Sequence, residues 1–298
     1  PQPLTTHKEN LMFWQMVSVE QKKLNSRKIL WLELALAAAA TAFIPLTLYF
    51  ASQSSDSNIV VTSDAPIEEL LSWPLALRSG IDLASGSGLG GLFIVILMGT
   101  LMAQEYGWRT MQLWLSNGVS RPVLMLAKFT AVLLPALFIV LAAFSGGAVT
   151  TAFITQKVQG GLPLAEVDWW QTALSILRTT YTLLPYAALT FLLAVVSRST
   201  IVAVGGGLAY TMLFEGALMQ LLNLAGGILG DMGQHLPAGL SNRLALLNRV
   251  SAATENSLVS IRPVDGVSVE TAVIGIALYT ILFVGLAILV FRRQDLGG

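Results

Sequence analysis

The sequence contains no cysteine and few charged residues. Of its 298 residues only 11% are charged, and 17 Lys and Arg residues balance 17 Asp and Glu residues. Without cysteine the chain has neither a disulfide framework nor a thiolate metal site. Without a basic excess it lacks the electrostatic means of binding phosphate backbones, so we exclude nucleic acid as a partner.

The shortage of charge also excludes an ordinary soluble domain. Soluble domains carry roughly 25% charged residues, whereas this chain is 54% hydrophobic with a mean hydropathy of +0.70. A transmembrane helix needs about 20 mostly apolar residues. The predicted spans are residues 29–50, 88–107, 123–147, 171–196, 200–225 and 271–291. We therefore predict an all-α polytopic membrane protein with six spans.

The distribution of basic residues predicts the orientation of the spans. Lys22 and Lys23 precede the first span, Arg121 and Arg198 lie in short connections, and Arg292 follows the last span. All of these positions fall on the side that holds both termini. Because cytoplasmic segments carry an excess of Lys and Arg, we predict an N-in, C-in topology. We expect a multi-pass location in a cell membrane of the bacterial cytoplasmic type.

Two segments outside the spans are also predicted to be helical. Residues 1–28 form a cytoplasmic tail, in which 9–28 suits an amphipathic helix along the inner interface with Trp14 as an anchor. An ordinary juxtamembrane tail is the alternative. Residues 226–270 are too apolar for a plain loop and too interrupted to span, which favours re-entrant or interfacial helices. Residues 29–298 then form one permease domain.

The sequence motifs of common enzymes are missing. There is no G-x-x-x-x-G-K-[ST] loop, no H-E-x-x-H and no G-x-S-x-G, and the chain has two histidines. The run Gly86-Ser-Gly-Leu-Gly-Gly91 has the spacing of a dinucleotide fingerprint, but it lies at the mouth of a span rather than after a strand. Close helix packing through Gly86 and Gly90 explains it better. We expect no catalytic activity, no metal and no cofactor in this chain.

Three charged residues lie well inside the predicted spans: Glu33, Arg178 and Glu215. Such residues are costly in hydrocarbon and are usually paired or functional. Glu33 is about one turn from the inner end of its span, so we expect it to reach the inner interface. Arg178 and Glu215 fall at similar depths on consecutive spans, given a rise of about 1.5 Å per residue. We predict an ion pair between them; the alternative places Arg178 at the outer surface and Glu215 at a subunit interface or in a transport pathway.

The connection between spans 2 and 3 carries a family pattern. It reads Glu105-Tyr-Gly-Trp-Arg-Thr-Met-Gln-Leu-Trp-Leu-Ser-Asn-Gly-Val-Ser-Arg121, and Lys128 follows within span 3. An acidic residue closes one span, a short amphipathic stretch follows, and a Ser-Arg turn leads into the next span. This pattern resembles the ABC-2 type permeases, the membrane subunits of ABC exporters, although Trp108-Arg109 replace the residues usual before the threonine. The six-span plan and the Glu20-Gln-Lys-Lys motif before span 1 extend the resemblance.

The resemblance implies how such a chain is driven. Two permease subunits, identical or paralogous, would pair within the membrane lipid. Two copies of a separate ABC ATPase subunit, which bind ATP and Mg, would dock beneath them. A helix over 108–120 would act as the coupling helix, and residues 226–270 would cover the exit. The residues implied in coupling are Glu105, Arg109, Leu113, Trp114, Leu115, Asn117 and Arg121.

A second class of function stays open at this point. A non-transporting accessory or assembly subunit of a larger membrane complex can have the same six-span pattern. The two classes differ in one observable property, because an exporter permease purifies with a nucleotide-binding subunit and an accessory subunit does not. The sequence does not identify a cargo.

Overall fold

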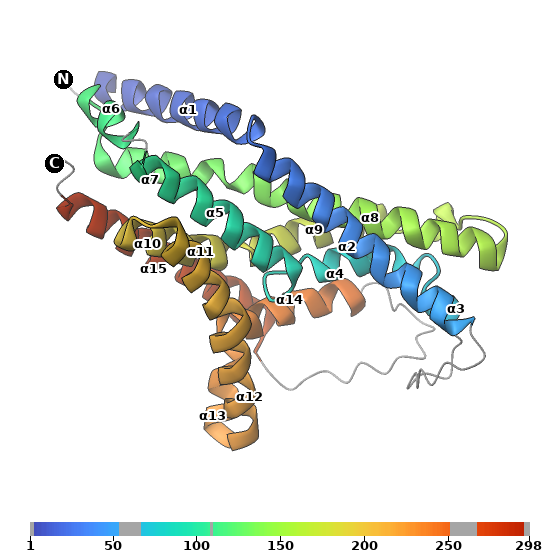
Figure 1. The fold of residues 1–298 in the computed structure, drawn as a ribbon. Coiled ribbons are helices and arrows are strands. Elements are labelled where there is room, and N and C mark those ends of the chain that lie inside the picture. The colour runs from blue at the N-terminus through green and yellow to red at the C-terminus, as the bar shows by residue number, and fades with distance from the viewer. Residues whose placement is uncertain (1–2, 54–66, 108–109, 251–266, 295–298) are drawn as a thin grey trace.

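The computed structural model describes residues 3–53, 67–107, 110–250 and 267–294 of the chain. Every regular element within these ranges is a helix. In Figure 1 most of the long helices lie side by side, while α12 and α13 bend away from the rest. Helix α1 begins and helix α15 ends at the same end of the molecule (Figure 1), which we call the inner end. The opposite end is called the outer end.

The helices follow one another in chain order with short connections. They are α1 (Pro3–Asn25), α2 (Lys28–Ser52), α3 (Ile67–Leu70), a 3-10 turn (Leu75–Arg78), α4 (Ser79–Leu83), α5 (Leu89–Gly107), α6 (Thr110–Ser116), α7 (Arg121–Ala131), α8 (Leu133–Gln159), a second 3-10 turn (Leu164–Glu166), α9 (Trp169–Thr182), α10 (Leu184–Ser197), α11 (Thr200–Leu208), a π-helical segment (Ala209–Phe214), α12 (Glu215–Ala225), α13 (Gly227–Gln234), α14 (Pro237–Val250) and α15 (Val269–Arg293).

Six helical segments are long and apolar enough to cross a membrane, and they coincide with the six predicted spans. The third is longer than predicted, because the helical segment extends over Arg121–Gln159 rather than stopping at residue 147. It ends where Gly160 adopts a left-handed conformation, with φ of 74°, and its amide donates to the Gln156 carbonyl. Glycine reaches this conformation without steric cost, which makes it a common helix terminator. The prediction missed this signal and ended the span too early.

Two prolines divide long spans into shorter helices. Pro135 lies in the first turn of α8, and Pro185 lies in the first turn of α10. Proline lacks the amide hydrogen that would bond the carbonyl four residues earlier. The third span is therefore divided into α7 and α8, and the fourth into α9 and α10.

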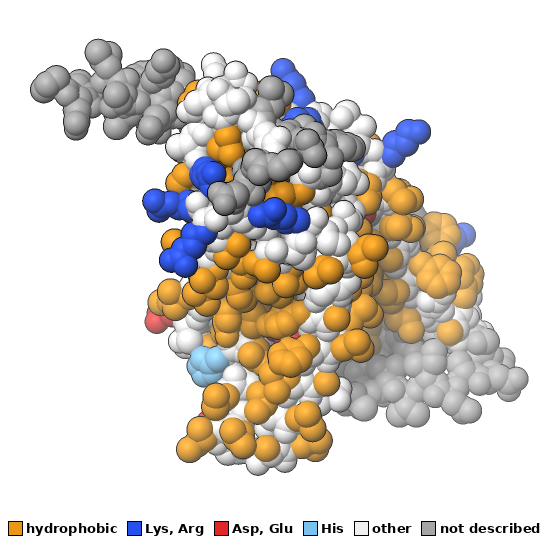
Figure 2. All heavy atoms as spheres, turned by 60° about the vertical axis from the view of Figure 1, so that its left-hand side comes forward, with side chains coloured by type: hydrophobic (Ala, Val, Ile, Leu, Met, Phe, Trp, Pro, Cys, Tyr) orange, Lys and Arg blue, Asp and Glu red, His pale blue; other side chains and the backbone are white. Residues whose placement is uncertain are grey.

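The spans divide into a central and a peripheral group. In the segments Leu89–Tyr106, Arg121–Gln159 and Trp169–Ser197 more than half of the most apolar stretch is buried, compared with 28% in α2 and 17% in Thr200–Leu222 and in α15. Figure 2 shows the consequence, a broad hydrophobic surface below a group of Lys and Arg side chains. Such a surface is far larger than soluble monomers expose, and it suits contact with lipid.

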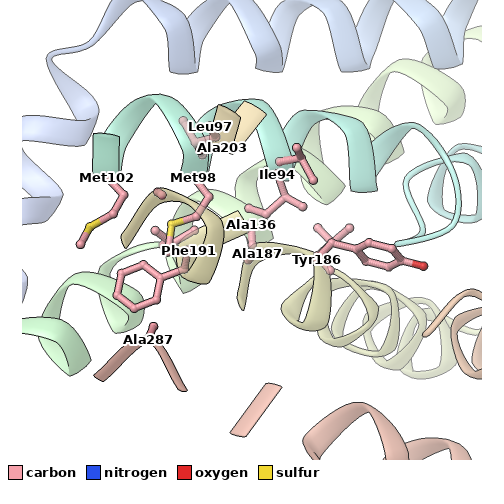
Figure 3. Close-up of a cluster of buried hydrophobic side chains, with 14 of the residues drawn as sticks. Ile94, Leu97, Met98, Met102, Ala136, Tyr186, Ala187, Phe191, Ala203 and Ala287 are labelled. Carbon is pink, nitrogen blue, oxygen red and sulfur yellow. The ribbon is translucent and has the colours of Figure 1, made fainter. Parts of the chain in front are cut away.

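The core lies where the central helices meet. Met98 of α5 and Phe191 of α10 lie beside Ala287 of α15 in Figure 3, and all three side chains are buried. This single cluster also includes residues of α1, α2, α7, α8 and α11. The peripheral helices are thus attached to the central ones through one continuous apolar core.

Residues before α5 form a helical cap on the outer part of α8. The backbone amide of Trp73 donates to Thr155 Oγ1 at 2.8 Å, and its indole Nε1 donates to Thr151 Oγ1 at 2.9 Å. Gly86 approaches α9 so closely that a Cβ would lie 2.2 Å from the Thr182 carbonyl oxygen. The prediction that this glycine-rich run serves close packing is confirmed.

Candidate functional site

Four charged side chains form a cluster near the inner end, which we call the inner charge cluster. Glu20 and Lys23 come from α1, Glu105 from the last turn of α5, and Lys128 from α7. Lys23 Nζ lies 3.0 Å from Glu20 Oε1 and 3.3 Å from Glu105 Oε1, and Lys128 Nζ lies 3.1 Å from Glu20 Oε1. Lys128 also contacts Glu105 Oε2. Each charge therefore has two partners of opposite sign.

The cluster is largely removed from solvent. The Lys128 and Glu105 side chains are 5% and 4% exposed, and the Glu20 side chain is 11% exposed. Lys23 is the most accessible member at 33%. Burial disfavours its charge, but the Glu105 and Glu20 carboxylates outweigh burial and hold the pKa of Lys23 above its usual value. Buried charges persist only when they are paired and hydrogen-bonded, and here the pairing joins three helices.

Polar contacts around the cluster add to its hold on α1. Arg27 Nη1 donates to Gln104 Oε1 at 2.6 Å, and Gln21 Nε2 donates to the carbonyl of Ala131. Beside them is a crevice of about 360 Å³, with the charged side chains on one wall and apolar residues of α5 and α10 on the other. The inner end of α1 is thus fastened to α5 and to the junction of α7 and α8.

Helix α6 leads from the cluster toward the inner surface, and it is shorter than predicted. The expected helix over 108–120 is described as Thr110–Ser116. It ends at Gly118, whose φ is 81°, with the amide of Gly118 donating to Leu115 O and the amide of Val119 donating to Trp114 O. This is the pattern of a Schellman terminator, which glycine favours.

The predicted coupling residues divide into internal and accessible groups. Trp114 and Leu115 are half-buried and pack against the core, and Lys23 Nζ lies 6.0 Å from the centre of the Trp114 ring. Asn117 is exposed. Arg109 and the side chain of Leu113 lie outside the described residues. Trp114 therefore connects α6 directly to the inner charge cluster.

Arg121 makes contacts within the chain rather than projecting from the rim of α6. Its Nη1 lies 3.1, 2.9 and 2.8 Å from the carbonyl oxygens of Phe291, Arg292 and Gln294. These carbonyls lie at the carboxyl end of α15, where a cation is favoured by the helix dipole. The structure thus gives Arg121 a role in holding α15 against α7.

The predicted ion pair between Arg178 and Glu215 is wrong. Glu215 is buried and accepts hydrogen bonds from Tyr186 Oη at 3.0 Å and from the backbone amide of Ala238 at 2.6 Å. Arg178 donates to Gln171 Oε1 at 3.0 Å and to Asn248 Oδ1 at 3.4 Å.

Helix α14 explains why these two residues do not meet. It supplies Ala238 near its start and Asn248 near its end, about 15 Å apart at a rise of 1.5 Å per residue. Each charged side chain thus finds a polar partner on α14. The sequence argument considered only spans 4 and 5 and could not include a third helix.

Glu33 does not reach the inner interface as predicted. It lies on the face of α2 that packs into the protein, it is 3% exposed, and neither carboxylate oxygen has a hydrogen-bond partner. The prediction placed it by depth along the helix. Its direction around the helix, which decides burial, was not considered.

The sequence argument also missed the inner charge cluster itself. Glu20 and Lys23 are three residues apart on one helix, a spacing that puts both on one face. Lys128 follows Arg121 by two turns inside an apolar helix, where an unpaired ammonium would be costly. These two signals, taken with Glu105 at the end of span 2, could have predicted the cluster.

Comparison with known proteins gives a family match for most of the chain. A family model described as "Protein of unknown function (DUF2705)" matches residues 88–297. The matched region includes Glu105 and Lys128 of the inner charge cluster, but not α1 with Glu20 and Lys23. No curated protein matches the sequence.

Proposed function

The chain belongs to the DUF2705 family, and we propose that it is the membrane subunit of an ABC-2 type exporter. It pairs with a second permease subunit, and two separate ATPase subunits drive it. The observation that carries this proposal is the connection between α6 and the inner charge cluster. Glu105 and Lys128, both in the motif that resembles ABC-2 permeases, bind each other beside the helix proposed to receive the ATPase.

The contacts offer a route for force from α6 into the spans. A displacement of α6 moves Trp114, which packs against Lys23, and Lys23 is bound to Glu105. Glu105 in turn contacts Lys128 in α7. Because buried ion pairs are costly to separate, the ends of α1, α5 and α7 move together. Closure of an ATPase beneath α6 would thus reach the second and third spans.

The topology we propose is N-in and C-in, with the inner end in the cytoplasm of a cell membrane. Its support is the gathering of Lys and Arg around the inner part of the molecule, above the hydrophobic surface in Figure 2. Helix α1 then lies along the inner interface, with the exposed Trp14 as an anchor. Helices α13 and α14 form the covering segment at the outer half. ATP and Mg bind in the partner ATPase, and the permease supplies no catalytic group.

The decisive experiment is purification of the tagged chain from its own membranes. We expect an ABC ATPase to accompany it, and the reconstituted complex to hydrolyse ATP faster than the isolated ATPase. Isolation of the folded chain without an ATPase would instead favour the accessory-subunit function.

A variant pair tests the role of α6 within that complex. Trp114→Asp places an unpaired charge at the contact with Lys23 and the core, which typically costs a few kcal/mol. We expect ATPase stimulation to fall at least tenfold while the variant still inserts and purifies. Trp170→Asp, at a tryptophan that is 71% exposed near the outer end, is the matched control and should leave stimulation unchanged. Equal stimulation in both variants would contradict the coupling role.

A further inference from the structure

Glu33 is a carboxyl group with unusual surroundings. The buried face of α2 is formed by Leu30, Glu33, Ala37, Thr41, Pro45 and Tyr49. These residues face the body of the protein, where α2 packs mainly against α8. Glu33 is thus the single ionisable residue of a helix face that is otherwise apolar or, at Thr41, hydrogen-bonded to backbone carbonyls of its own helix and of α8.

The other buried carboxyl groups in spans have partners, and Glu33 has none. Glu105 is held by two lysines, and Glu215 accepts two hydrogen bonds. Both oxygens of Glu33 are buried without a donor. An unsatisfied polar group inside a protein costs free energy and calls for an explanation.

Charged groups on the neighbouring helices do not compensate Glu33. Those described on α1, α3, α4, α5 and α8, the helices packed against α2, are Glu20, Lys22, Lys23, Glu68, Asp82, Glu105 and Lys157. Among the described residues all ion pairs belong to the inner charge cluster, and none includes Glu33. Glu68 accepts from Ser52, Asp82 accepts from Asn248, and Lys157 lies over the Phe153 ring at the far end of α8.

The chemistry of such a site selects a proton as its ligand. An ionised, unpaired carboxylate in an apolar interior costs many kcal/mol, and a group in that situation is neutralised instead. A metal cation needs several oxygen ligands, whereas the positions before and after Glu33 on this face are Leu30 and Ala37. A proton needs one oxygen and removes the charge.

We propose that Glu33 is a proton-binding site, held as the neutral carboxylic acid while α2 packs on α8. Ionisation then requires this face of α2 to open to water or to a cation. The proton occupancy of Glu33 is thereby linked to the packing of the first span against the third. The inference depends on the burial of α2 and not on the proposed ATPase partner.

A hydrophobic carbodiimide tests the site directly. The carboxylic acid adds across one C=N bond of the reagent, with its proton passing to nitrogen and its oxygen to carbon, and the O-acylisourea rearranges to a stable N-acylurea without a leaving group. A carboxylate exposed to water is ionised at neutral pH and lacks the proton that this addition needs. The full chain in lipid vesicles at neutral pH is treated with dicyclohexylcarbodiimide, digested and mapped by mass spectrometry.

We expect Glu33 to be labelled at least tenfold more than Glu105, whose carboxylate is ion-paired. A water-soluble carbodiimide should label Glu33 poorly, because the group is 3% exposed. Glu33→Gln should abolish the label in its peptide, and Glu215→Gln, the control, should leave it unchanged. The wild-type measurement stands even if a variant folds badly.

Three results would overturn the proposal. An unlabelled Glu33 in folded protein that becomes labelled only at acidic pH would mean that it is ionised. Equal labelling by the water-soluble reagent would mean that it is open to solvent. Protection by Na⁺ or K⁺ at constant ionic strength would make the ligand a metal cation.

Discussion

Replacing Lys128 by Met tests whether the inner charge cluster holds the helices together. Methionine keeps most of the apolar stem and removes the ammonium group that contacts both Glu20 and Glu105. Glu105, 4% exposed, is then left with Lys23 at 3.3 Å as its remaining partner. Removing one partner of a buried ion pair costs about 3–5 kcal/mol, and because Lys23 remains we expect the lower end, about 3 kcal/mol.

A loss of about 3 kcal/mol changes the unfolding equilibrium by roughly a hundredfold. The assay is unfolding in mixed micelles with an increasing mole fraction of dodecyl sulfate, followed by tryptophan fluorescence. The double variant Lys128→Met with Glu105→Gln removes both charges, so it should cost about 1–3 kcal/mol less than the sum of the single variants. The control Lys157→Met changes an exposed lysine and should cost less than about 1 kcal/mol.

The reasoning fails if Lys128→Met is no more destabilising than Lys157→Met. It also fails if the effects of Lys128→Met and Glu105→Gln are additive, because additivity means that the two side chains do not interact. Either result would separate the geometry of the cluster from its energy.

Two further predictions concern packing and topology. Gly86→Ala introduces a Cβ that would lie 2.2 Å from a backbone oxygen of α9, so we expect a loss of about 2–3 kcal/mol in the same micelle assay; Gly285→Ala, where nothing lies within 4 Å, should change stability by no more than about 1 kcal/mol, and similar effects of the two would contradict the close contact. Single cysteines at Ala165 and Asn117, both exposed and at opposite ends of the bundle, should react with an impermeant thiol reagent from outside in intact cells at Ala165 and not at Asn117; the reverse pattern would invert the proposed topology.

The positions of the spans were predictable because hydrocarbon thickness imposes a length on every apolar helix. All six predicted spans coincide with helices that are long and apolar enough to cross a membrane. The ends were less predictable where the signal is one residue. Gly118 and Gly160 terminate helices through left-handed conformations, and both were present in the sequence as glycines after polar residues. Reading them as terminators would have shortened α6 and lengthened the third span.

The side-chain partners were largely unpredictable, because they depend on helix rotation and on segments between spans. Depth along a helix suggested that Arg178 should meet Glu215, yet α14 provides separate partners for both. Depth also suggested that Glu33 should reach water, yet its direction places it inside the protein. Spacing gave a better guide at Glu20 and Lys23, because residues three apart on a helix share a face whatever the rotation.

The contacts of Gln294 have a consequence for the order of assembly during synthesis. Gln294 bonds to Tyr106 and to the carbonyl of Val195, and its own carbonyl accepts from Arg121. It is separated from Tyr106 by 188 residues. At a translation rate of about 5–20 residues per second, roughly 10–40 s pass before the ribosome adds this residue. For that time the ends of α5, α7 and α10 are already made but lack their final partner. The inner end of the molecule, where an ATPase is proposed to dock, therefore matures last.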